Sequence, residues 1–274
     1  MILVDGNNQF IRFYSQLGFM KIDGKNVGGM FGFLRSLYYL NQRFNDNVSV
    51  VWDGKRSSDK RKEAYTDYKK NRIAGRFDSD LFETRDEVKN ILQHMTGINQ
   101  YVGINVEADD VIADIVNYSY NEKFIIVSSD KDFWQLLDNE DIKILRNNKL
   151  FGLKEMKKET GCNSAKMFLL CRALSGDASD GIKGVERVGF KTALKIVKEN
   201  MINDYKDIVD KNLHKDIVDR NLKLMTLGVG HLELNKNYEI YCSNKNLGDF
   251  VLWCIKYKFQ SLIEVAEDFI KEGQ

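Results

Sequence analysis

Acidic residues follow several strand-like runs in this sequence. The apolar run at residues 124–127 suits a buried strand, and it breaks into Asp130 and Asp132 before helical spacing resumes. In open parallel α/β sheets, the carboxyl ends of the strands form the edge at which ligands bind. The same arrangement recurs at three further places: residues 2–4 lead into Asp5, residues 48–52 lead into Asp53, and residues 101–106 lead into Glu107, Asp109 and Asp110.

If these strands are parallel neighbours, their acids converge on one rim of the sheet. Two carboxylates about 4 Å apart repel by roughly 4 kcal/mol at an effective dielectric constant of about 20. Such a rim needs cations, and its oxygen ligands favour hard divalent ions such as magnesium or manganese. For Glu107, Asp109 and Asp110 alone, the alternative is an ordinary helix start, where acids complement the helix dipole. Asn7 and Asn8 have two interpretations: they position a metal-bound water, or they form a turn.

A second acid pair lies further along the chain. An apolar helix is expected at residues 168–174, and it leads into a bend flanked by glycines. Asp177 and Asp180 are three residues apart in this bend, so both can face one ion.

Directly after this bend the sequence predicts an anion-binding turn. Gly184 and Gly189 bracket a tight turn, and a helix is expected at residues 191–197. Backbone amides of such a turn and of a helix start bind anions, and Lys191 and Lys195 add positive charge. Carbonyl groups of the turn are a candidate site for a monovalent cation such as K⁺, held between protein and phosphate.

Residues 54–80 are rich in basic side chains, with tyrosines among them. The basic residues are Lys55, Arg56, Lys60, Arg61, Lys62, Lys69, Lys70, Arg72 and Arg76. If the segment is helical, one face carries Arg61, Tyr65, Tyr68, Lys69 and Arg72. Concentrated basic and aromatic side chains suit a phosphate backbone and stacked bases, and the alternative is an ordinary solvated face.

The composition describes a soluble globular protein: of 274 residues, 43% are hydrophobic and 30% are charged. The net charge of +1 indicates no partner by itself. The cysteines lack metal-ligand spacing and are expected to be reduced thiols: Cys162, Cys171, Cys242 and Cys254. The apolar start ends at Asp5, so we expect no signal peptide, and no apolar run approaches the about 20 residues of a membrane helix.

Other patterns predict the elements around these residues. The first 53 residues are expected to form strand, helix and strand, with the apolar helix at 30–40. Further helices are expected at 81–97 and 111–116, a short hairpin around residues 147–148, and helices that complete the core over 201–274. Asp114 and Asp138 are expected at the surface.

Six motifs occur in a fixed order over residues 1 to about 200. They are LVDGNN at 3–8, VVWDG at 50–54, YTDYKKNR at 65–72, VEADDVIADI at 106–115, VSSDKDFWQLL at 127–137 and LSGDASDGIKGVERVGFKTA at 174–193. Together they resemble the structure-specific 5′ nuclease family, which includes phage 5′–3′ exonucleases, flap endonucleases and the 5′ nuclease domain of bacterial DNA polymerase I. The chain length and the lack of a polymerase region resemble the stand-alone phage-type enzymes.

The resemblance implies an α/β fold with a central, mostly parallel sheet of PIN-like type flanked by helices. It places an α/β nuclease core at residues 1–152, with a basic helical arch at about 54–80. It places a helical region at residues 153–274, with a duplex-DNA-binding motif of helix–turn–helix type at about 174–198.

The resemblance also implies roles for single residues. Lys69 matches the lysine that reaches the scissile phosphate, and Arg72 lies beside it. Two Mg²⁺ ions, for which Mn²⁺ can substitute, would be bound by Asp5, Asp53, Glu107, Asp109, Asp110, Asp130, Asp132, Asp177 and Asp180. The implied DNA contacts are Arg61, Tyr65, Tyr68, Lys70, Arg172, Lys183, Gly184, Val185, Val188, Gly189, Lys191 and Lys195. Gly181 stands where Asn is common in the family, and the prolines usual in these motifs are missing.

The implied activity is metal-dependent hydrolysis of phosphodiesters near single-strand/duplex junctions, on DNA with a 5′ flap, overhang or nick. One alternative is removal of RNA primers from RNA–DNA hybrids, and another is a non-catalytic junction-binding protein. A small PIN-type ribonuclease would account for the acidic rim but not for residues 174–198. A monomer without membrane contact is expected, in the cytoplasm of a bacterial cell or a phage-infected host.

Overall fold

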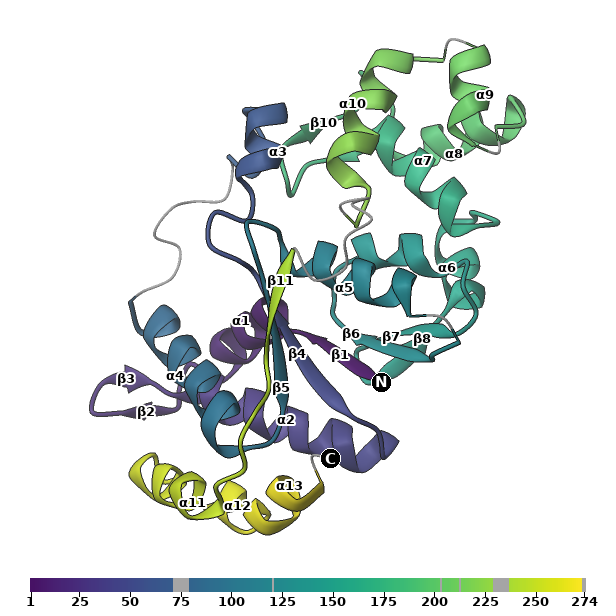
Figure 1. The fold of residues 1–274 in the computed structure, drawn as a ribbon. Helices are drawn as coiled ribbons and strands as arrows, with labels where there is room; N and C mark the ends of the chain where they lie inside the picture. Colours follow the sequence, from purple (N-terminus) through teal and green to yellow (C-terminus); the bar gives the residue numbers. More distant parts are fainter. Residues whose placement is uncertain (71–78, 120, 203, 212, 229–236, 273–274) are drawn as a thin grey trace.

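A seven-stranded sheet lies at the centre of the computed structural model, which describes residues 1–70, 79–119, 121–202, 204–211, 213–228 and 237–272. The strands stand in the order β11-β5-β4-β1-β6-β7-β8 (Figure 1). Their bounds are β1 Ile2–Asp5, β4 Val48–Trp52, β5 Asn99–Gly103, β6 Phe124–Val127, β7 Ile142–Arg146, β8 Lys149–Phe151 and β11 Tyr238–Tyr241.

The inner strands of this sheet are parallel. β1 pairs in parallel with both β4 and β6, β4 pairs in parallel with β5, and β6 does so with β7. The prediction that the acid-bearing strands are parallel neighbours is therefore confirmed. The chain passes from β1 to one side of the sheet and later enters β6 on the other side, so the strand order reverses at β1. A ligand crevice is expected at the carboxyl end of such a strand.

The strand expected at residues 101–106 is displaced. β5 ends at Gly103, and Asn105 has a φ of 55°, in the left-handed region that interrupts a strand. Glu107 consequently does not end a strand but caps the helix that follows, α5 (Ala108–Tyr118).

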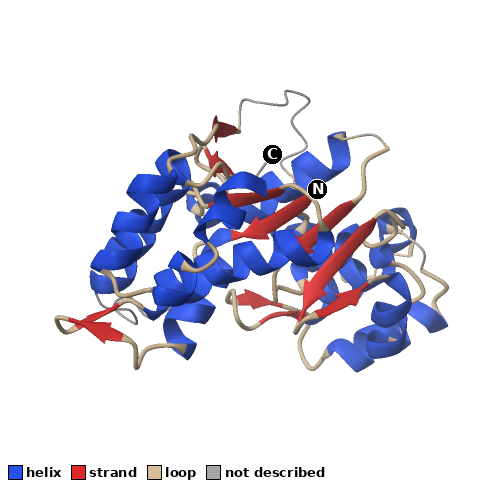
Figure 2. Cartoon of the chain, turned by 90° about the horizontal axis from the view of Figure 1, so that it is seen from below, coloured by secondary structure: helices blue, strands red, loops and turns tan. Residues whose placement is uncertain are grey.

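Helices cover both faces of the sheet (Figure 2). Alternate residues of β1 point to opposite faces, so Ile2 and Val4 join one hydrophobic cluster and Leu3 joins the other. The cluster of Ile2 includes residues of α1 Gly6–Gln16, α2 Gly28–Phe44, α4 Ser79–Met95, α11 Leu247–Lys256, α12 Gln260–Ile263 and α13 Ala266–Glu272. The cluster of Leu3 includes residues of α5, the 3₁₀ helix η1 Asp132–Leu136, α6 Leu153–Thr160, α7 Ala165–Ser175, α8 Phe190–Glu199, α9 Tyr205–Asp210 and α10 Lys215–Met225.

The predicted helices at 30–40, 81–97, 111–116 and 168–174 are confirmed as parts of α2, α4, α5 and α7. The order strand, helix, strand over the first 53 residues is wrong, because two helices and the hairpin of β2 (Lys21–Ile22) and β3 (Lys25–Asn26) lie between β1 and β4. The predicted hairpin at 147–148 is confirmed. Asn147 and Asn148 have φ values of 49° and 61°, and they join antiparallel strands β7 and β8.

The C-terminal part returns to the sheet, which the all-helical expectation for residues 201–274 missed. β11 pairs antiparallel with β5 at the edge of the sheet, and α11 to α13 follow it. Among the described residues, no helix is long and apolar enough to cross a membrane.

The basic segment is not one continuous helix. α3 (Asp59–Ala64) ends at Tyr65, whose backbone is extended, and Lys69 has a φ of 54°. The expected helical face therefore does not form over its described part, from Arg61 to Lys69. Arg72 and Arg76 lie outside the described residues.

Candidate active site

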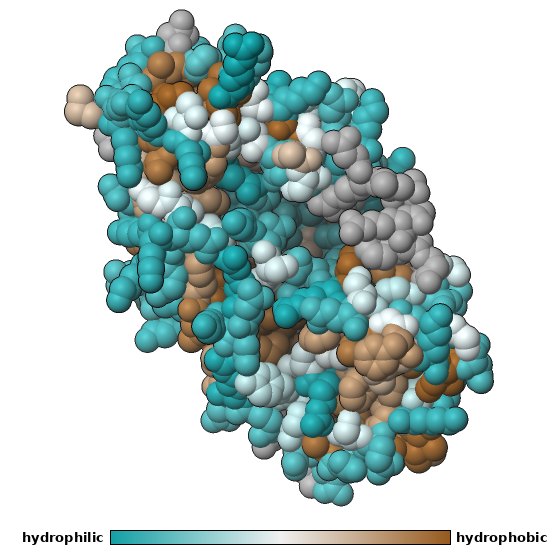
Figure 3. All heavy atoms as spheres, turned by 180° about the vertical axis from the view of Figure 1, so that it is seen from behind, coloured by the Kyte–Doolittle hydropathy of each residue, from teal (hydrophilic) through white to brown (hydrophobic). Residues whose placement is uncertain are grey.

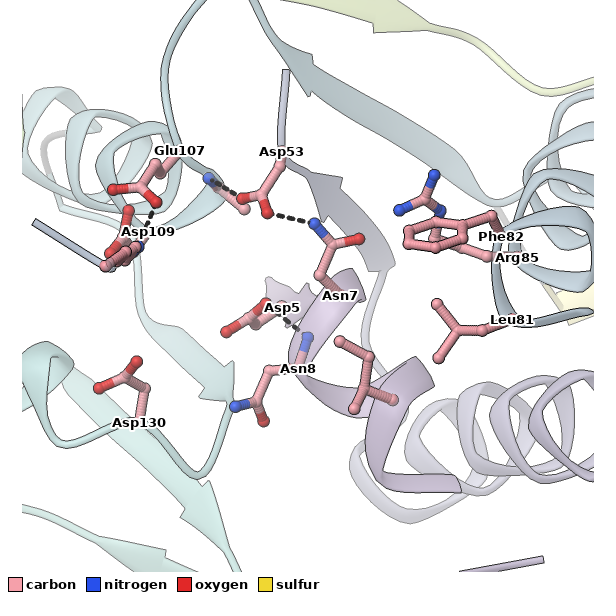
Figure 4. Close-up of a pocket in the computed structure, with 13 residues that line it drawn as sticks. Asp5, Asn7, Asn8, Asp53, Leu81, Phe82, Arg85, Glu107, Asp109 and Asp130 are labelled. Atoms are coloured by element: carbon pink, nitrogen blue, oxygen red, sulfur yellow. Dashed lines mark hydrogen bonds and ion pairs between the residues drawn. The ribbon is translucent and has the colours of Figure 1, made fainter. Parts of the chain in front are cut away.

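Five acids line one pocket at the carboxyl end of the sheet, with a volume of about 380 Å³. The strand-end pocket, as we name it, is lined by Asp5, Asn7, Asn8, Ile11, Asp53, Lys69, Leu81, Phe82, Arg85, Glu107, Ala108, Asp109 and Asp130. Figure 4 shows the acids gathered on one side and Leu81, Phe82 and Arg85 of α4 on the other. The sequence thus correctly predicted that these acids meet.

Backbone contacts fix the acids that end β1 and β4. Asp5 caps α1 by accepting from the Asn8 N–H at 3.1 Å, and its other oxygen accepts from the Ser128 hydroxyl at 2.9 Å. Asp53 accepts from the Ala108 N–H at 2.8 Å, which ties the end of β4 to the start of α5.

A glycine contact brings these two elements together. A Cβ added to Gly54 would lie 2.1 Å from the carbonyl oxygen of Gly103, closer than any side chain permits. The Gly54 N–H donates to the Val106 carbonyl at 3.1 Å. The loop after β4 can therefore lie directly against the loop that carries Glu107.

The buried carboxylates of this region resist ionisation. Burial and the neighbouring Asp53 and Asp130 raise the pKa of Asp5 to about 7. Burial and Asp110 raise the pKa of Asp109 well above its usual range. A bound cation would reverse these effects, because a nearby positive charge favours the ionised form.

Glu107 already has cationic partners from the basic segment. The Lys69 ammonium pairs with one oxygen, and Arg61 Nη1 donates to the other at 2.7 Å. The Tyr68 hydroxyl also donates to Glu107, at 2.8 Å. Although burial opposes ionisation, Lys69 and Arg61 hold the pKa of Glu107 below its usual range.

Two residues expected to contact DNA, the half-buried Arg61 and the buried Tyr68, have partners within the protein instead. Arg61 pairs through two nitrogens with Asp110, both at 2.7 Å, and its Nε donates to the Leu224 carbonyl at 2.9 Å. Tyr68 is only 3% exposed and packs against Ile182. The prediction that Arg61 and Tyr68 face DNA is therefore wrong, because Arg61 pairs with the protein's own acids and Tyr68 packs against apolar residues.

Two acids also lie differently from expectation. Asp110 faces Arg61 and does not line the strand-end pocket, so α5 presents Asp109 and Asp110 in different directions. Asp114 is buried and not at the surface. Asp138 is exposed, as expected, and it accepts from the N–H groups of Ala165 and Lys166 at the start of α7, a capping role.

A second acidic pocket, the hairpin pocket, adjoins the first. Its volume is about 260 Å³, and it is lined by Ser129, Asp130, Lys131, Asp132, Arg172, Asp177, Ser179 and Asp180. One oxygen each of Asp132, Asp177 and Asp180 lie within 4.8 Å of one another. Asp130 lines both pockets, so all the predicted acids except Asp110 line one continuous site.

The hairpin pocket is built by the short strands β9 (Gly176–Asp177) and β10 (Ile182–Lys183), which pair antiparallel after α7. Gly176 has a φ of 74°, and a Cβ on Gly184 would lie 2.2 Å from the Ser175 carbonyl carbon. These glycines let the hairpin fold back on the end of α7. Arg172, expected to contact DNA, points into this pocket and bridges Asp132 and Asp177 at 2.5 and 2.6 Å.

The donors fit hard divalent ions. All the converging ligands are oxygens, the kind that such ions prefer. Burial and Asp130 raise the pKa of Asp132 to about 7, another sign that this charge density lacks compensation. Asn7 Oδ1 is buried and has no hydrogen-bond partner among the described residues, and Asn7 Nδ2 donates to Asp53. The interpretation of Asn7 as a residue of the site is therefore favoured over its interpretation as a turn former.

The predicted duplex-binding turn presents lysines to solvent. Val188 N–H donates to the Val185 carbonyl at 3.0 Å, and Gly189 precedes α8 as its N-cap. The side chains of Lys183 and Lys195 are 78% and 72% exposed, and Lys191 is exposed as well. Val185 is buried, Val188 is half-buried, and both can contact DNA only through the backbone or by supporting the turn.

The remaining basic-segment residues are less enclosed. Lys70 is 72% exposed, and Tyr65 is half-buried under the Arg220 guanidinium, whose Cζ lies 4.9 Å from the ring centroid. The Lys69 N–H donates to the Asp180 carbonyl at 2.7 Å. The basic segment is thus attached to both acidic pockets. The face in Figure 3 is largely hydrophilic around a central hollow.

Sequence reasoning missed Phe82 and Arg85 as pocket residues, and it missed Ser128 as a hydrogen-bond partner of Asp5. Ser128 directly follows β6, so its place in the motif at 127–137 was a usable signal. Phe82 and Arg85 are on α4, which carries no motif, and only the folded structure brings them to the pocket.

The arrangement defines an α/β fold with an acidic site whose oxygens could hold divalent metal ions. Solved structures share this fold. A T5 5′-exonuclease with bound zinc has a TM-score of 0.69 at 20% identity, over 99% of this chain and 97% of that chain. A bacteriophage T5 flap endonuclease complex with DNA and metal ions has a TM-score of 0.67 at 20% identity, over 99% and 98%. The Rad2 catalytic core in complex with DNA has a TM-score of 0.53 at 13% identity, over 98% of this chain and 91% of that chain.

The chain belongs to the 5′–3′ exonuclease family. The family model described as 5′–3′ exonuclease, N-terminal resolvase-like domain, matches residues 1–161. A 5′–3′ exonuclease of Buchnera aphidicola subsp. Baizongia pistaciae is 33% identical over 218 residues, 76% of this chain and 70% of that protein. DNA polymerase I of Streptococcus pneumoniae is 31% identical over 213 residues, 73% of this chain but only 24% of the polymerase.

Proposed function

We propose that this nuclease hydrolyses DNA phosphodiesters near single-strand/duplex junctions, acting on 5′ flaps, overhangs or nicks with Mg²⁺. The continuous acidic site of the two pockets carries the proposal. The DNA complexes of the T5 flap endonuclease and of Rad2 support it, because this chain shares their fold. The setting we propose is the cytoplasm of a bacterial cell or a phage-infected host, with the protein as a monomer.

The strand-end pocket would hold one ion through Asp5, Asp53, Glu107, Asp109 and Asp130, and the hairpin pocket would hold a second through Asp132, Asp177 and Asp180. Asp110 supports this set by fixing Arg61. Such ions would supply an activated water and stabilise the leaving oxygen. Lys69, which lines the strand-end pocket, offsets charge on the transferring phosphate. Arg72 is proposed for the same task on sequence grounds alone.

The DNA duplex would be bound away from the two acidic pockets in which hydrolysis occurs. We propose that the turn 184–189 and the start of α8 bind the phosphate backbone through Lys183, Lys191 and Lys195, with K⁺ at the turn. This divides the labour between a nuclease core at residues 1–152 and a helical region at 153–274. The lysines contact phosphates rather than bases, so recognition follows shape and not sequence.

The test is cleavage of an end-labelled 5′ flap with Mg²⁺ by Asp130→Asn. Asp130 lines both pockets, so its loss should lower the cleavage rate about a thousandfold, roughly 4 kcal/mol of barrier. Asp141→Asn is the matched control, because Asp141 is exposed at the opposite end of β7. Full activity in Asp130→Asn would refute the proposed site. Matched RNA and DNA 5′ ends in the same assay test the RNA-primer alternative.

A further inference from the structure

The structure places a protein cation inside the hairpin pocket. A single nitrogen of Arg172, Nη2, donates to Asp132 Oδ1 at 2.5 Å and to Asp177 Oδ2 at 2.6 Å. The exposed fractions of the Arg172, Asp132 and Asp177 side chains are 16%, 17% and 14%. The guanidinium therefore joins two carboxylates of different elements, away from most of the solvent. Ion pairs shielded to this degree are stronger than those at the surface.

Local structure holds the guanidinium in this place. Arg172 lies in the last turn of α7, where the helix dipole favours a positive side chain. Its carbonyl accepts the N–H of Gly176, which begins β9, so the helix end is hydrogen-bonded to the start of the hairpin. Its Cζ lies 6.0 Å from the centroid of the Phe168 ring, one turn earlier. The fold thus positions the Arg172 side chain for its contacts with Asp132 and Asp177.

The oxygens that Arg172 occupies are those a second ion needs. Asp177 Oδ1 already accepts from the Ser179 N–H at 2.8 Å and hydroxyl at 2.6 Å, which leaves Oδ2 as its open ligand. That Oδ2 is the atom bonded to Arg172. A dication bound there would repel an adjacent guanidinium, since like charges about 4 Å apart repel by several kcal/mol at an effective dielectric constant of about 20.

We propose that Arg172 is the resident counterion of the hairpin pocket and that a second divalent ion enters by displacing it. The inference rests on the proposed function, because it assumes that the acids bind metal. The displaced guanidinium is then free to bind a phosphate of the DNA, which adds an electrostatic gain that offsets the lost ion pairs. Substrate and second ion thereby assist each other, while Arg172 keeps the carboxylates paired in their absence. Arg172 is a positioning residue in this scheme.

The experiment measures Mn²⁺ binding without DNA, by calorimetry and by paramagnetic resonance of bound Mn²⁺. Arg172→Ala should bind the second Mn²⁺ about tenfold more tightly than the wild type, because no guanidinium must be displaced. Arg172→Lys keeps the charge and should stay near the wild type. Arg146→Ala is the matched control, since Arg146 pairs with Glu159 at 3.0 Å outside both pockets.

Thermal unfolding provides a second readout that holds even if Arg172→Ala is weakly folded. With chelator, Arg172→Ala should melt below the wild type, and added Mn²⁺ should raise its Tm by more. A second-ion affinity in Arg172→Ala equal to or weaker than that of the wild type overturns the Arg172 assignment while leaving the nuclease proposal intact. Failure of all variants and the wild type to bind any divalent ion, together with no flap cleavage, overturns both.

Discussion

The two acidic pockets are built by different means. Parallel strands paired along their whole length carry Asp5 and Asp53 to the strand-end pocket. The hairpin pocket depends on the two-residue strands β9 and β10 and on the end of α7. One acid of each pocket also differs in its pKa. Burial and neighbouring acids raise the pKa of Asp5, whereas Ser179 and Arg172, acting against burial, hold the pKa of Asp177 below its usual range.

This difference indicates that backbone contacts at the sheet edge hold Asp5 and Asp53 in place despite their repulsion, while the side chain of Arg172 bridges Asp132 and Asp177 of the hairpin pocket. Sheet register is fixed by many backbone hydrogen bonds and by two hydrophobic clusters, so the acids at its edge cannot move apart. The hairpin has few such restraints. Arg172 supplies the attraction that backbone pairing supplies elsewhere.

Lys69→Ala should show the largest effect of the changes that test this comparison. Lys69 contacts the strand-end pocket through Glu107 and the hairpin pocket through the Asp180 carbonyl. Only the side-chain contact is lost, so kcat should fall by a factor of about 10² to 10³ with little change in the Kd for flap DNA. Single-turnover cleavage and fluorescence anisotropy measure the two quantities. Lys149→Ala, on exposed β8, is the control; equal losses in rate and binding would assign Lys69 to docking.

Charge removal at Asp5 and at Asp177 should act in opposite directions on the stability of the metal-free protein. The folded pKa of Asp5, about 7, exceeds its unfolded value of 3.8, so the folded state binds more protons between these values. Stability from this group is complete below pH 3.8 and is lost as pH rises through about 7. Asp5→Asn should therefore stabilise the chelated protein at pH 8 by up to roughly 3 kcal/mol and change little at pH 4.

Asp177→Asn should do the reverse. Its folded pKa is lowered, so its contribution is present above the unfolded value and lost as pH falls through the folded one. Neutralising Asp177 should destabilise the chelated protein at pH 8. Urea unfolding of both variants at the two pH values measures the effects. The same sign for both variants at pH 8 would remove the electrostatic distinction between the pockets.

The sequence allowed the strand-end pocket to be predicted better than the hairpin pocket, for a physical reason. An acid after a buried apolar run must lie at the sheet edge once the strands are parallel, so Asp5, Asp53 and Asp130 followed from local pattern alone. Arg172 is 40 residues from Asp132, and nothing local reveals that its guanidinium turns inward. Basic residues look alike in sequence, whether they face DNA or a buried acid.

The prediction that one helical face of the basic segment contacts DNA failed for the same reason. Arg61 has the spacing of an exposed helical residue, but its partner Asp110 is 49 positions away. Gly54 illustrates the opposite case, in which sequence cannot distinguish a glycine in a flexible turn from one required by close approach to Gly103. Such contacts are decided by tertiary packing and not by local periodicity.

Glycine substitutions should affect the two pockets separately, and their effect should be smaller than that of the charge changes. Gly54→Ala puts a Cβ against the Gly103 carbonyl, and Gly184→Ala puts one against Ser175, at 2.1 and 2.2 Å. Each should cost about 2 kcal/mol of unfolding free energy. Gly54→Ala should weaken mainly the first Mn²⁺ in a titration, and Gly184→Ala mainly the second. Gly189→Ala is the matched control for stability, because a Cβ there meets nothing within 4 Å. Equal effects on both ions from either change would mean that the pockets form as one unit.

The smallest effect is expected at the turn and helix start that we propose bind duplex DNA, away from both pockets. Lys191 and Lys195 are exposed on the first turns of α8, next to the turn that begins at Gly184. A lysine that neutralises one phosphate releases about one counterion, so each Lys→Ala change should lower the slope of log K against log salt by about 1. Binding to flap DNA at several salt concentrations gives the slope, with Lys154→Ala on α6 as the control. Because these contacts only hold the duplex, cleavage of bound substrate should proceed at the wild-type rate. A loss of single-turnover rate at saturating DNA would instead show that the grip on the duplex sets the geometry of the hairpin pocket, to which α8 is joined through β10 and the turn.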